Sequence, residues 1–531
     1  MFWADKLAYE IVERKRDVYL TECGLGASGI PHVGNLGDGI RAYTVSLALR
    51  ELGVKSDFQA FSDDRDGLRK IPFGFPSKLR EYIGKPVSRI PDPFSCHESY
   101  GNHMSFLLVD ALERCGVELK FISSDEAYSK GFFDSVISEI LSNWKRCGEI
   151  IFEMTGQEKY LERLPFYTIC EECGKIYTTR VLEFFEKERE VFYKCDDRFL
   201  GKDSNTGEEI EVFGCGHSGR TSVRNGKLAW KVEFAARWKA YDVIFEAYGK
   251  DILDSVKVND KICEEILGQN PPIHTFYEMF VERGGRKISG SRGNIFTPQL
   301  WLSYASPESL RLLMLKRLST TRVVDLEEIP KYSDEVDHLS EIYFGGVENL
   351  SEREEKHLRR LYEYVYFLNP PERKPIGVEY NLLINLARLL PEELSNREEL
   401  IIEILQNSKR IPKELDEKSK KELLKRIEFT TTYTSQVKPS EKVKLELEDR
   451  ERKALRELSE KLKLEREAEE IQSIIFEVAK KHGIKSVRFF QVLYTLILGI
   501  ERGPRASTLI KTVGQGKVRE VIRRVLDENC N

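Results

Sequence analysis

The chain has 531 residues, of which 41% are hydrophobic and 32% are charged, and its formal net charge is −5. A chain of this length is too long to form a single hydrophobic core, so we expect two to four domains. Because the net charge is negative, the overall charge gives no evidence for a nucleic-acid partner. No apolar run reaches the roughly 20 residues that span a bilayer, and residues 1–6 lack the order of a signal peptide. We expect a cytoplasmic protein without a membrane partner, whose ten cysteines serve packing or metal binding rather than disulfides.

The N-terminal 84 residues predict the start of a parallel nucleotide-binding sheet. Residues 17–23 indicate a buried strand, and a Gly-rich loop (24–29), a helix that ends near Gly53 and a strand over 54–61 follow. Ligands of such sheets bind beyond the carboxyl ends of the strands. We therefore expect an α/β fold with a Rossmann-type catalytic domain, formed by residues 1–84 and by residues 231–320, where helices and strands alternate again.

Residues 85–230 are irregular and rich in Cys, His and Gly, which is typical of an insertion with metal sites. Four cysteines have the spacing of a zinc ribbon: Cys170, Cys173, Cys195 and Cys215. His217 is the alternative fourth ligand. A second set combines a carboxylate, a thiolate and two imidazoles: Asp92, Cys96, His97 and His103. We interpret these sets as one or two structural Zn²⁺ sites, with ordinary packing as the alternative for the second.

The rest of the chain predicts helices almost throughout. We expect a helical connector over residues 321–370 and an α-helical domain over 371–531. Lys and Arg side chains gather near its end and can contact phosphates, although a solvated helix face is the alternative. These residues are Arg502, Arg505, Lys511, Lys517, Arg519, Arg523 and Arg524.

Two short motifs predict ATP handling. In the first, the loop before a helix carries Gly29, His32, Gly34 and Asn35, so that backbone N–H groups and the helix dipole face an incoming phosphate. His32 can donate a hydrogen bond to phosphate oxygens. The second motif is a Gly-flanked basic loop over 286–294 that can close on a triphosphate; its key residues are Lys287, Ser289 and Ser291.

Together, the segments 32–35 and 287–291 resemble the "HIGH" and "KMSKS" signatures of class I aminoacyl-tRNA synthetases. Segments 23–35, 91–100, 230–233 and 501–505 make nearly the whole chain similar to the class I lysyl-tRNA synthetases found mainly in archaea. The resemblance implies ATP-dependent activation of L-lysine and its transfer to tRNA(Lys), with Mg²⁺ on the phosphates. It implies catalytic roles for His32, Lys287 and Ser291, an anticodon-reading helical domain, and zinc in the Asp92–His103 segment. We expect a monomer.

A lysine pocket needs a carboxylate for the ammonium group and an apolar wall for the methylene groups. Asp63, Asp64 and Glu233 are the candidate carboxylates, and Trp230 is the candidate wall. By similarity, Gly24 and Trp230 lie at the family's lysine pocket. The alternative is that Trp230 is a core residue and that the aspartates cap a helix.

The chain also departs from the family pattern. Ile252 stands where the family has a histidine, Asp254-Ser255-Val256-Lys257 replaces a Gly/Ser-rich segment, and Gly26 replaces a threonine. These departures leave two alternatives open. One is a class I synthetase for glutamate or arginine, and the other is a catalytically reduced paralogue that binds tRNA. A general nucleotidylyltransferase would leave the helical half unexplained.

Overall fold

A computed structural model describes residues 1–281, 283–285, 296–390, 396–407, 409–437, 447–499 and 505–528. The chain forms two compact units. The first contains residues 1–301, 310–325 and 349–370, and the second contains 302–309, 326–348 and 371–531. Among the described residues, no helix combines the length and the apolar composition needed to cross a bilayer.

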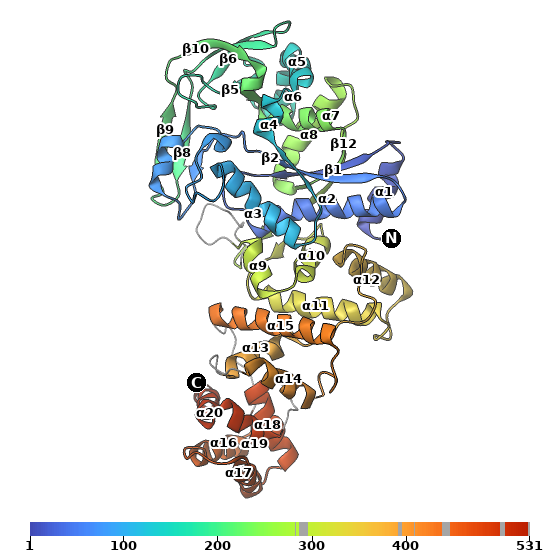
Figure 1. Ribbon diagram of the computed structural model, residues 1–531, viewed down its shortest axis with the longest axis vertical. Helices are drawn as coiled ribbons and strands as arrows, with labels where there is room; N and C mark the ends of the chain where they lie inside the picture. Colours follow the sequence, from blue (N-terminus) through green and yellow to red (C-terminus); the bar gives the residue numbers. More distant parts are fainter. Residues whose placement is uncertain are drawn as a thin grey trace. The chain divides into compact units, whose positions relative to one another are not determined.

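A five-stranded parallel sheet organises the first unit. Its strands, in spatial order, are β13 (Ile273–Tyr277), β12 (Val243–Gly249), β1 (Tyr19–Leu25), β2 (Ser56–Ser62) and β4 (Lys120–Ser123). The inner strands β12, β1 and β2 are almost wholly buried, as expected for strands that helices cover on both faces. The helices α2 (Val33–Glu51) and α3 (Tyr100–Arg114) cover one face, and α7 (Trp230–Tyr241) and α8 (Leu253–Glu265) cover the other (Figure 1). The predicted Rossmann-type fold class is confirmed.

The segment 85–230 contains more regular structure than its sequence indicates. Strand β4 lies within it and is an edge strand of the central sheet, and it is too short and too exposed to give a periodic signal. The rest folds into small helices and sheets. These are α4 (Ser124–Ser129), α5 (Asp134–Ser142), α6 (Trp144–Thr155), β5 (Phe166–Thr168), β6 (Arg180–Phe185), β7 (Glu190–Lys194), β8 (Arg198–Asp203), β9 (Glu209–Phe213), β10 (Ser218–Ser222) and β11 (Gly226–Leu228), with β3 (Lys70–Ile71) pairing with β8.

The helical character predicted beyond residue 320 is also found. The elements after β13 are β14 (Phe280–Val281), α9 (Pro298–Tyr304), α10 (Pro307–Leu315), β15 (Arg322–Val323), α11 (Glu328–Tyr343), α12 (Glu352–Val365), α13 (Tyr380–Leu389), α14 (Arg397–Asn407), α15 (Glu417–Gln436), α16 (Asp449–Lys461), α17 (Ala468–Lys481), α18 (Ser486–Leu498), α19 (Ala506–Val513) and α20 (Gln515–Glu528). In the second unit, α13–α20 bury one continuous set of Leu, Ile and Val side chains.

Candidate functional site

A pocket of about 280 Å³ opens at the carboxyl edge of the central sheet. It spans the ends of β1 and β12, from which the chain continues to opposite sides of the sheet. In open parallel sheets, ligands bind at this reversal point. Several residues singled out in the sequence line it: Gly24, His32, Gly34, Asn35, Asp63 and Trp230.

His32 forms one end of the pocket and also begins α2. Its backbone is extended, its Nδ1 accepts a hydrogen bond from the N–H of Gly34 at 3.0 Å, and its own N–H donates to Asn35 Oδ1 at 3.0 Å. Because Nδ1 accepts, the proton of the neutral ring is on Nε2, which can donate to a ligand. A Cβ at Gly34 would lie 2.8 Å from the His32 ring, so this ring position requires glycine. Gly29 lies outside the pocket lining.

The second motif, with Lys287, Ser289 and Ser291, lies outside the described residues. Both described segments that flank it reach the His32 turn. The backbone oxygen of Phe296 accepts a hydrogen bond from the N–H of Val33 at 2.9 Å. The Phe280 ring lies 3.8 Å from the position of a Cβ on Gly34. The described residues on either side of the second motif therefore contact the first motif.

Trp230 and Asp63, two of the residues predicted to contact lysine, both line this pocket. Trp230 is 37% exposed, and its ring meets Phe234 edge-on with centroids 4.4 Å apart. Asp63 follows β2. Burial, together with the negative charge of Asp66, raises the pKa of Asp63 well above its usual value. A bound cation would relieve both effects.

The other two candidate carboxylates lie outside the pocket lining and have protein partners. Asp64 Oδ2 accepts from the Ser123 hydroxyl at 2.6 Å, and its Oδ1 accepts from Ser124 at 2.7 Å. Glu233 accepts from the Tyr128 hydroxyl at 2.8 Å and pairs with Lys227 at 2.8 Å. Both carboxylates are buried, and their hydrogen bonds hold segments of the first unit together.

A buried ionic network beneath Gly24 was not predicted. Arg237 bridges two carboxylates at 2.5 Å, with its Nε on Glu22 and its Nη2 on Glu246. Gln59 donates to Glu22 at 2.5 Å, and the Trp238 indole donates to Glu246. One signal could have indicated it: Glu22 and Glu246 are single charges in otherwise apolar strands. Burial of that kind requires a paired partner.

Other pocket residues also went unnoticed in the sequence. Asp38, Asp251 and Tyr277 line the end nearest β12 and β13. The Tyr277 hydroxyl donates to Asp38 Oδ1. Burial raises the pKa of Asp38 to about 7. Asp38 lies one turn beyond Asn35 on α2, where helical spacing alone does not distinguish an inward carboxylate from a solvated one.

Both candidate metal sets come together. The ligand atoms of Cys170, Cys173, Cys195 and Cys215 all lie within 4.8 Å of one another, as do those of Asp92, Cys96, His97 and His103. Two Sγ–Sγ distances in the first set are 3.6 and 3.7 Å. A tetrahedral Zn²⁺ with bonds of about 2.3 Å places thiolates about 3.8 Å apart, so the first set fits the ion.

The Asp92 set also fits a cation, because its carboxyl group is held in the ionised form. Burial alone would raise the pKa of Asp92, but backbone N–H groups of Phe94, His97 and Cys96 donate to its carboxylate and lower its pKa to about 2. The two imidazole Nδ1 atoms of this set each lie 3.2 Å from Cys96 Sγ. One carboxylate, one thiolate and two imidazoles are ligands that Zn²⁺ accepts.

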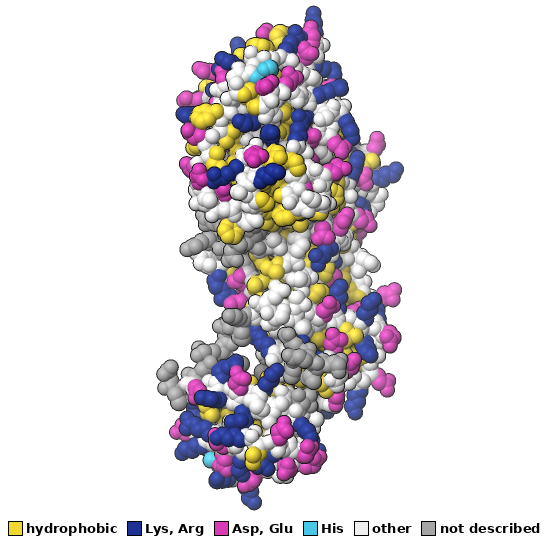
Figure 2. All heavy atoms as spheres, turned by 60° about the vertical axis from the view of Figure 1, so that its left-hand side comes forward, with side chains coloured by type: hydrophobic (Ala, Val, Ile, Leu, Met, Phe, Trp, Pro, Cys, Tyr) yellow, Lys and Arg dark blue, Asp and Glu magenta, His cyan; other side chains and the backbone are white. Residues whose placement is uncertain are grey.

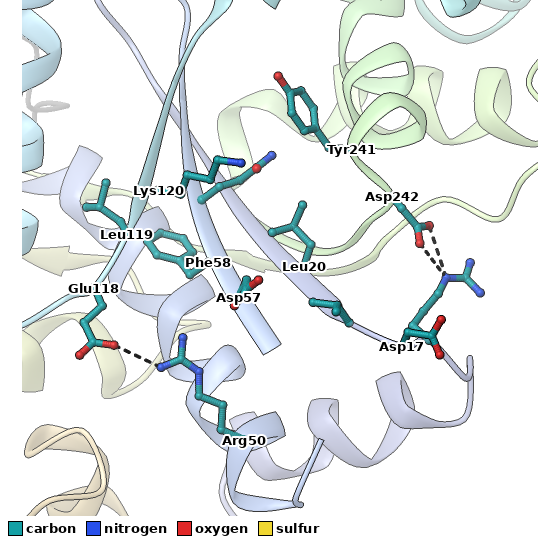
Figure 3. Close-up of a pocket in the computed structure, with 13 residues that line it drawn as sticks. Asp17, Leu20, Arg50, Asp57, Phe58, Glu118, Leu119, Lys120, Tyr241 and Asp242 are labelled. Atoms are coloured by element: carbon teal, nitrogen blue, oxygen red, sulfur yellow. Dashed lines mark hydrogen bonds and ion pairs between the residues drawn. The ribbon is translucent and has the colours of Figure 1, made fainter. Parts of the chain in front are cut away.

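A larger pocket of about 760 Å³ lies at the opposite, amino edge of the sheet (Figure 3). Arg16 and Asp242 form an ion pair across part of it at 3.1 Å, and Arg50 pairs with Glu118 at 3.5 Å. Four of the seven charged residues that line this pocket are thus paired within the protein. Since parallel sheets bind ligands at their carboxyl edge, we assign the chemistry to the smaller pocket.

Comparisons with known proteins identify the family of the chain. The family model described as tRNA synthetases class I (K) matches residues 1–367, and the model described as anticodon binding domain matches residues 385–526. A lysine–tRNA ligase of Cenarchaeum symbiosum is 44% identical over 529 residues, which is 98% of both chains. One of Rickettsia bellii is 33% identical over 96% of this chain and 93% of its own. A solved glutamate-tRNA synthetase of Elizabethkingia anophelis has a TM-score of 0.36 at 12% identity and covers 96% of this chain and 100% of its own.

Proposed function

The chain belongs to the class I tRNA synthetases (K), and we propose that it activates L-lysine with ATP and transfers the product to tRNA(Lys). In the first step, the lysine carboxylate attacks the α-phosphate of ATP, which gives lysyl-adenylate and pyrophosphate. In the second, a ribose hydroxyl at the tRNA end takes the aminoacyl group and AMP leaves.

The negative charge of the pocket lining is the observation that supports lysine as the amino-acid substrate. Its lining includes four carboxylates, those of Asp38, Asp63, Glu246 and Asp251. Among the described residues of the lining, the one guanidinium is that of Arg237, and it is already paired with Glu22 and Glu246. Such a site favours a ligand with positive charges and opposes a glutamate side chain. Lysine brings two ammonium groups.

The strand order suggests how the two substrates divide the pocket. Asp63 follows β2, whereas Tyr277 ends β13, and β1 and β12 lie between these strands. With strands about 4.8 Å apart, the two residues are separated by about 14 Å. We place the lysine side chain at the Asp63 end, with Trp230 as its apolar wall. ATP takes the end nearest α2 and β13.

Catalysis rests on positioning and on donors to the developing phosphate charge. His32 Nε2 and the first turn of α2 face the triphosphate end, and we assign pyrophosphate stabilisation to Lys287 with Ser291 beside it. Gly29, Gly34, Asn35 and Ser289 are the proposed ATP-binding residues. Mg²⁺ accompanies the triphosphate and neutralises part of its charge.

The departures from the family pattern do not remove this charge balance. Ile252 and Gly26 line the pocket, where they add no hydrogen-bonding side chain. The residues that carry the proposal are elsewhere, on β1, α2, β12 and after β2. A catalytically reduced paralogue would bind tRNA and form no adenylate, and pyrophosphate exchange detects that difference.

The test is ATP–pyrophosphate exchange with each of the twenty amino acids. We expect exchange with lysine, and Asp63→Asn to raise the KM for lysine at least tenfold, because one charge-assisted hydrogen bond contributes about 1.5–3 kcal/mol. Asp64→Asn is the matched control: it removes a neighbouring carboxylate that already has protein partners, so the KM for lysine should stay close to that of the wild type. Exchange with glutamate or arginine instead of lysine would refute the proposal.

The cysteine set and the Asp92 set are proposed structural Zn²⁺ sites. Zn²⁺ would join the three segments that carry Cys170 and Cys173, Cys195, and Cys215, and a second ion would fix the loop 92–97 to the start of α3. Neither set contributes to the lining of the reaction pocket, so the metals have no assigned step in the chemistry.

A groove of about 630 Å³ between α16 and α20 is the proposed tRNA-binding surface of the second unit. Its basic lining residues are Arg456, Lys463, Arg519 and Arg523. Figure 2 shows many Lys and Arg side chains on the surface of this unit. Lys and Arg in such grooves bind the phosphate backbone.

A further inference from the structure

Arg41 is a buried guanidinium close to the ATP end of the pocket. It lies on α2, and its exposed fraction is 0%. Nε, Nη1 and Nη2 all lack a hydrogen-bond partner among the residues that the structure describes. A buried charge without hydrogen bonds is costly, and replacing such charges by apolar side chains is often neutral or stabilising. Stability alone therefore does not account for Arg41.

Gly37 makes room for this guanidinium. A Cβ at Gly37 would lie 2.2 Å from Arg41 Nη1 and 3.4 Å from Met314 Sδ. Glycine within a helix is unfavourable, so α2 accepts a weaker helix former at this turn. The position of Arg41 is thus built into the packing of α2.

Arg41 reaches the pocket through Tyr277 and Asp38. Its guanidinium carbon lies 3.8 Å from the centroid of the Tyr277 ring. The Tyr277 hydroxyl in turn donates to Asp38 Oδ1, and both residues line the pocket. A Cβ at Gly249 would lie 2.6 Å from Asp251 Oδ1 and 3.7 Å from the Tyr277 oxygen, so glycine at the end of β12 leaves room for both side chains.

The charges around Asp38 give Arg41 a particular importance. After burial, the Tyr277 hydrogen bond and then Arg41 favour the ionised form and so lower the pKa of Asp38, whereas Glu246 on β12 and Asp251 after β12 raise it. Arg322 on β15 faces Arg41 and opposes its charge. Arg41 is therefore the cation that favours a carboxylate at Asp38.

We propose that Arg41 is a positioning residue of the ATP site, which holds Tyr277 and Asp38 so that Asp38 meets ATP as a carboxylate and accepts hydrogen bonds from the ribose hydroxyl groups. The inference rests on the proposed function for its ligand. Asp38 lies one turn beyond the phosphate-facing start of α2, and the ribose adjoins the α-phosphate. Carboxylates that accept from ribose hydroxyls recur in α/β nucleotide sites.

The experiment measures the Kd of Mg-ATP by calorimetry on the full chain, without lysine, at pH values below and above 7. In the wild type, affinity should rise through pH 7, near the pKa of about 7 at which Asp38 loses its proton. Arg41→Met keeps the length and removes the charge, so the rise should move to higher pH and Kd at neutral pH should weaken about tenfold, the equivalent of one pKa unit. Its melting temperature should equal or exceed that of the wild type.

Three comparisons separate positioning from structure. Arg41→Lys keeps the charge and should stay nearer the wild type than Arg41→Met. In an Asp38→Asn background, Arg41→Met should cause no further loss of affinity. With 2′-deoxy-ATP or 3′-deoxy-ATP, the difference between wild type and Arg41→Met should shrink for the nucleotide that lacks the hydroxyl bound by Asp38.

Several results would overturn the inference. An unchanged pH dependence in Arg41→Met, or an equal loss of affinity in the Asp38→Asn background, would remove Arg41 from the site. A full difference with both deoxynucleotides would refute the hydrogen bond to the ribose. Absence of lysine-dependent exchange by the wild type would count against the proposed function alone, because ATP titration does not depend on it.

Discussion

The imidazole of His32 has two tasks at once. Nδ1 closes the first turn of α2 by accepting from the N–H of Gly34, and this fixes the proton on Nε2, toward the proposed triphosphate. Substitution can therefore lower stability, catalysis or both. A side chain that caps a helix but has no imidazole separates the two effects.

Two substitutions of His32 make that separation. Asn is among the best residues at the start of a helix, whereas Ala costs about 1 kcal/mol there. We expect His32→Ala and His32→Asn to slow lysine-dependent exchange by about 10²–10³-fold, the usual effect of losing one transition-state donor. In thermal unfolding, only His32→Ala should lower the melting temperature clearly. Wild-type exchange in His32→Asn would show that the ring matters only as a cap.

Part of the pocket could be predicted from the sequence, because a short local motif determines the conformation of its own backbone. A Gly-rich turn before a helix predicts where His32 and Gly34 lie. Asp63 and Asp64 could not be told apart in this way. They are adjacent after the same strand, and successive side chains there point to opposite sides. Only the packing shows that Asp64 meets Ser123 and Ser124 while Asp63 lines the pocket.

Within the segment 85–230, the spacing of the cysteines predicted the metal-ligand set, whereas hydrophobic periodicity did not predict the strands. One Cys-x-x-Cys pair and two later cysteines predicted that four thiolates would meet, and they do. The surrounding strands β6–β10 have only five or six residues each, which is too short for an alternating pattern to identify them. For the same reason β4 could not be assigned to the central sheet from the sequence.

Removal of metal tests the two proposed sites. We expect about two Zn²⁺ per chain by elemental analysis, about one in Cys170→Ser, and a lower melting temperature after treatment with a strong chelator, because binding of the ion is coupled to folding of its ligands. Cys263→Ser is the matched control, since this cysteine is buried away from both sets and its substitution should leave the zinc content unchanged. Full occupancy in Cys170→Ser would contradict the assignment.

For the whole molecule, the sequence predicted the secondary-structure class of each half better than the residue boundaries between the two units. Long amphipathic patterns indicated the helical half directly. The division into units could not be read in the same way, because residues 310–325 and 349–370 return to the first unit while 326–348 belong to the second. Helical periodicity reports which face of a helix is buried, and not which core buries it.

In the proposed function the two units have separate tasks, and substitutions in the groove between α16 and α20 test this division. We expect Arg456→Gln with Arg523→Gln to raise the KM for tRNA in aminoacylation. The slope of log affinity against log salt should fall by about one for each phosphate that the protein no longer neutralises. Lysine-dependent exchange, which takes place in the first unit, should not change. The control pair Lys418→Gln and Lys421→Gln removes the same charge from α15, outside the groove, and should leave the slope intact. If it weakened tRNA binding equally, the groove would have no special role and the unit would act through its general charge alone.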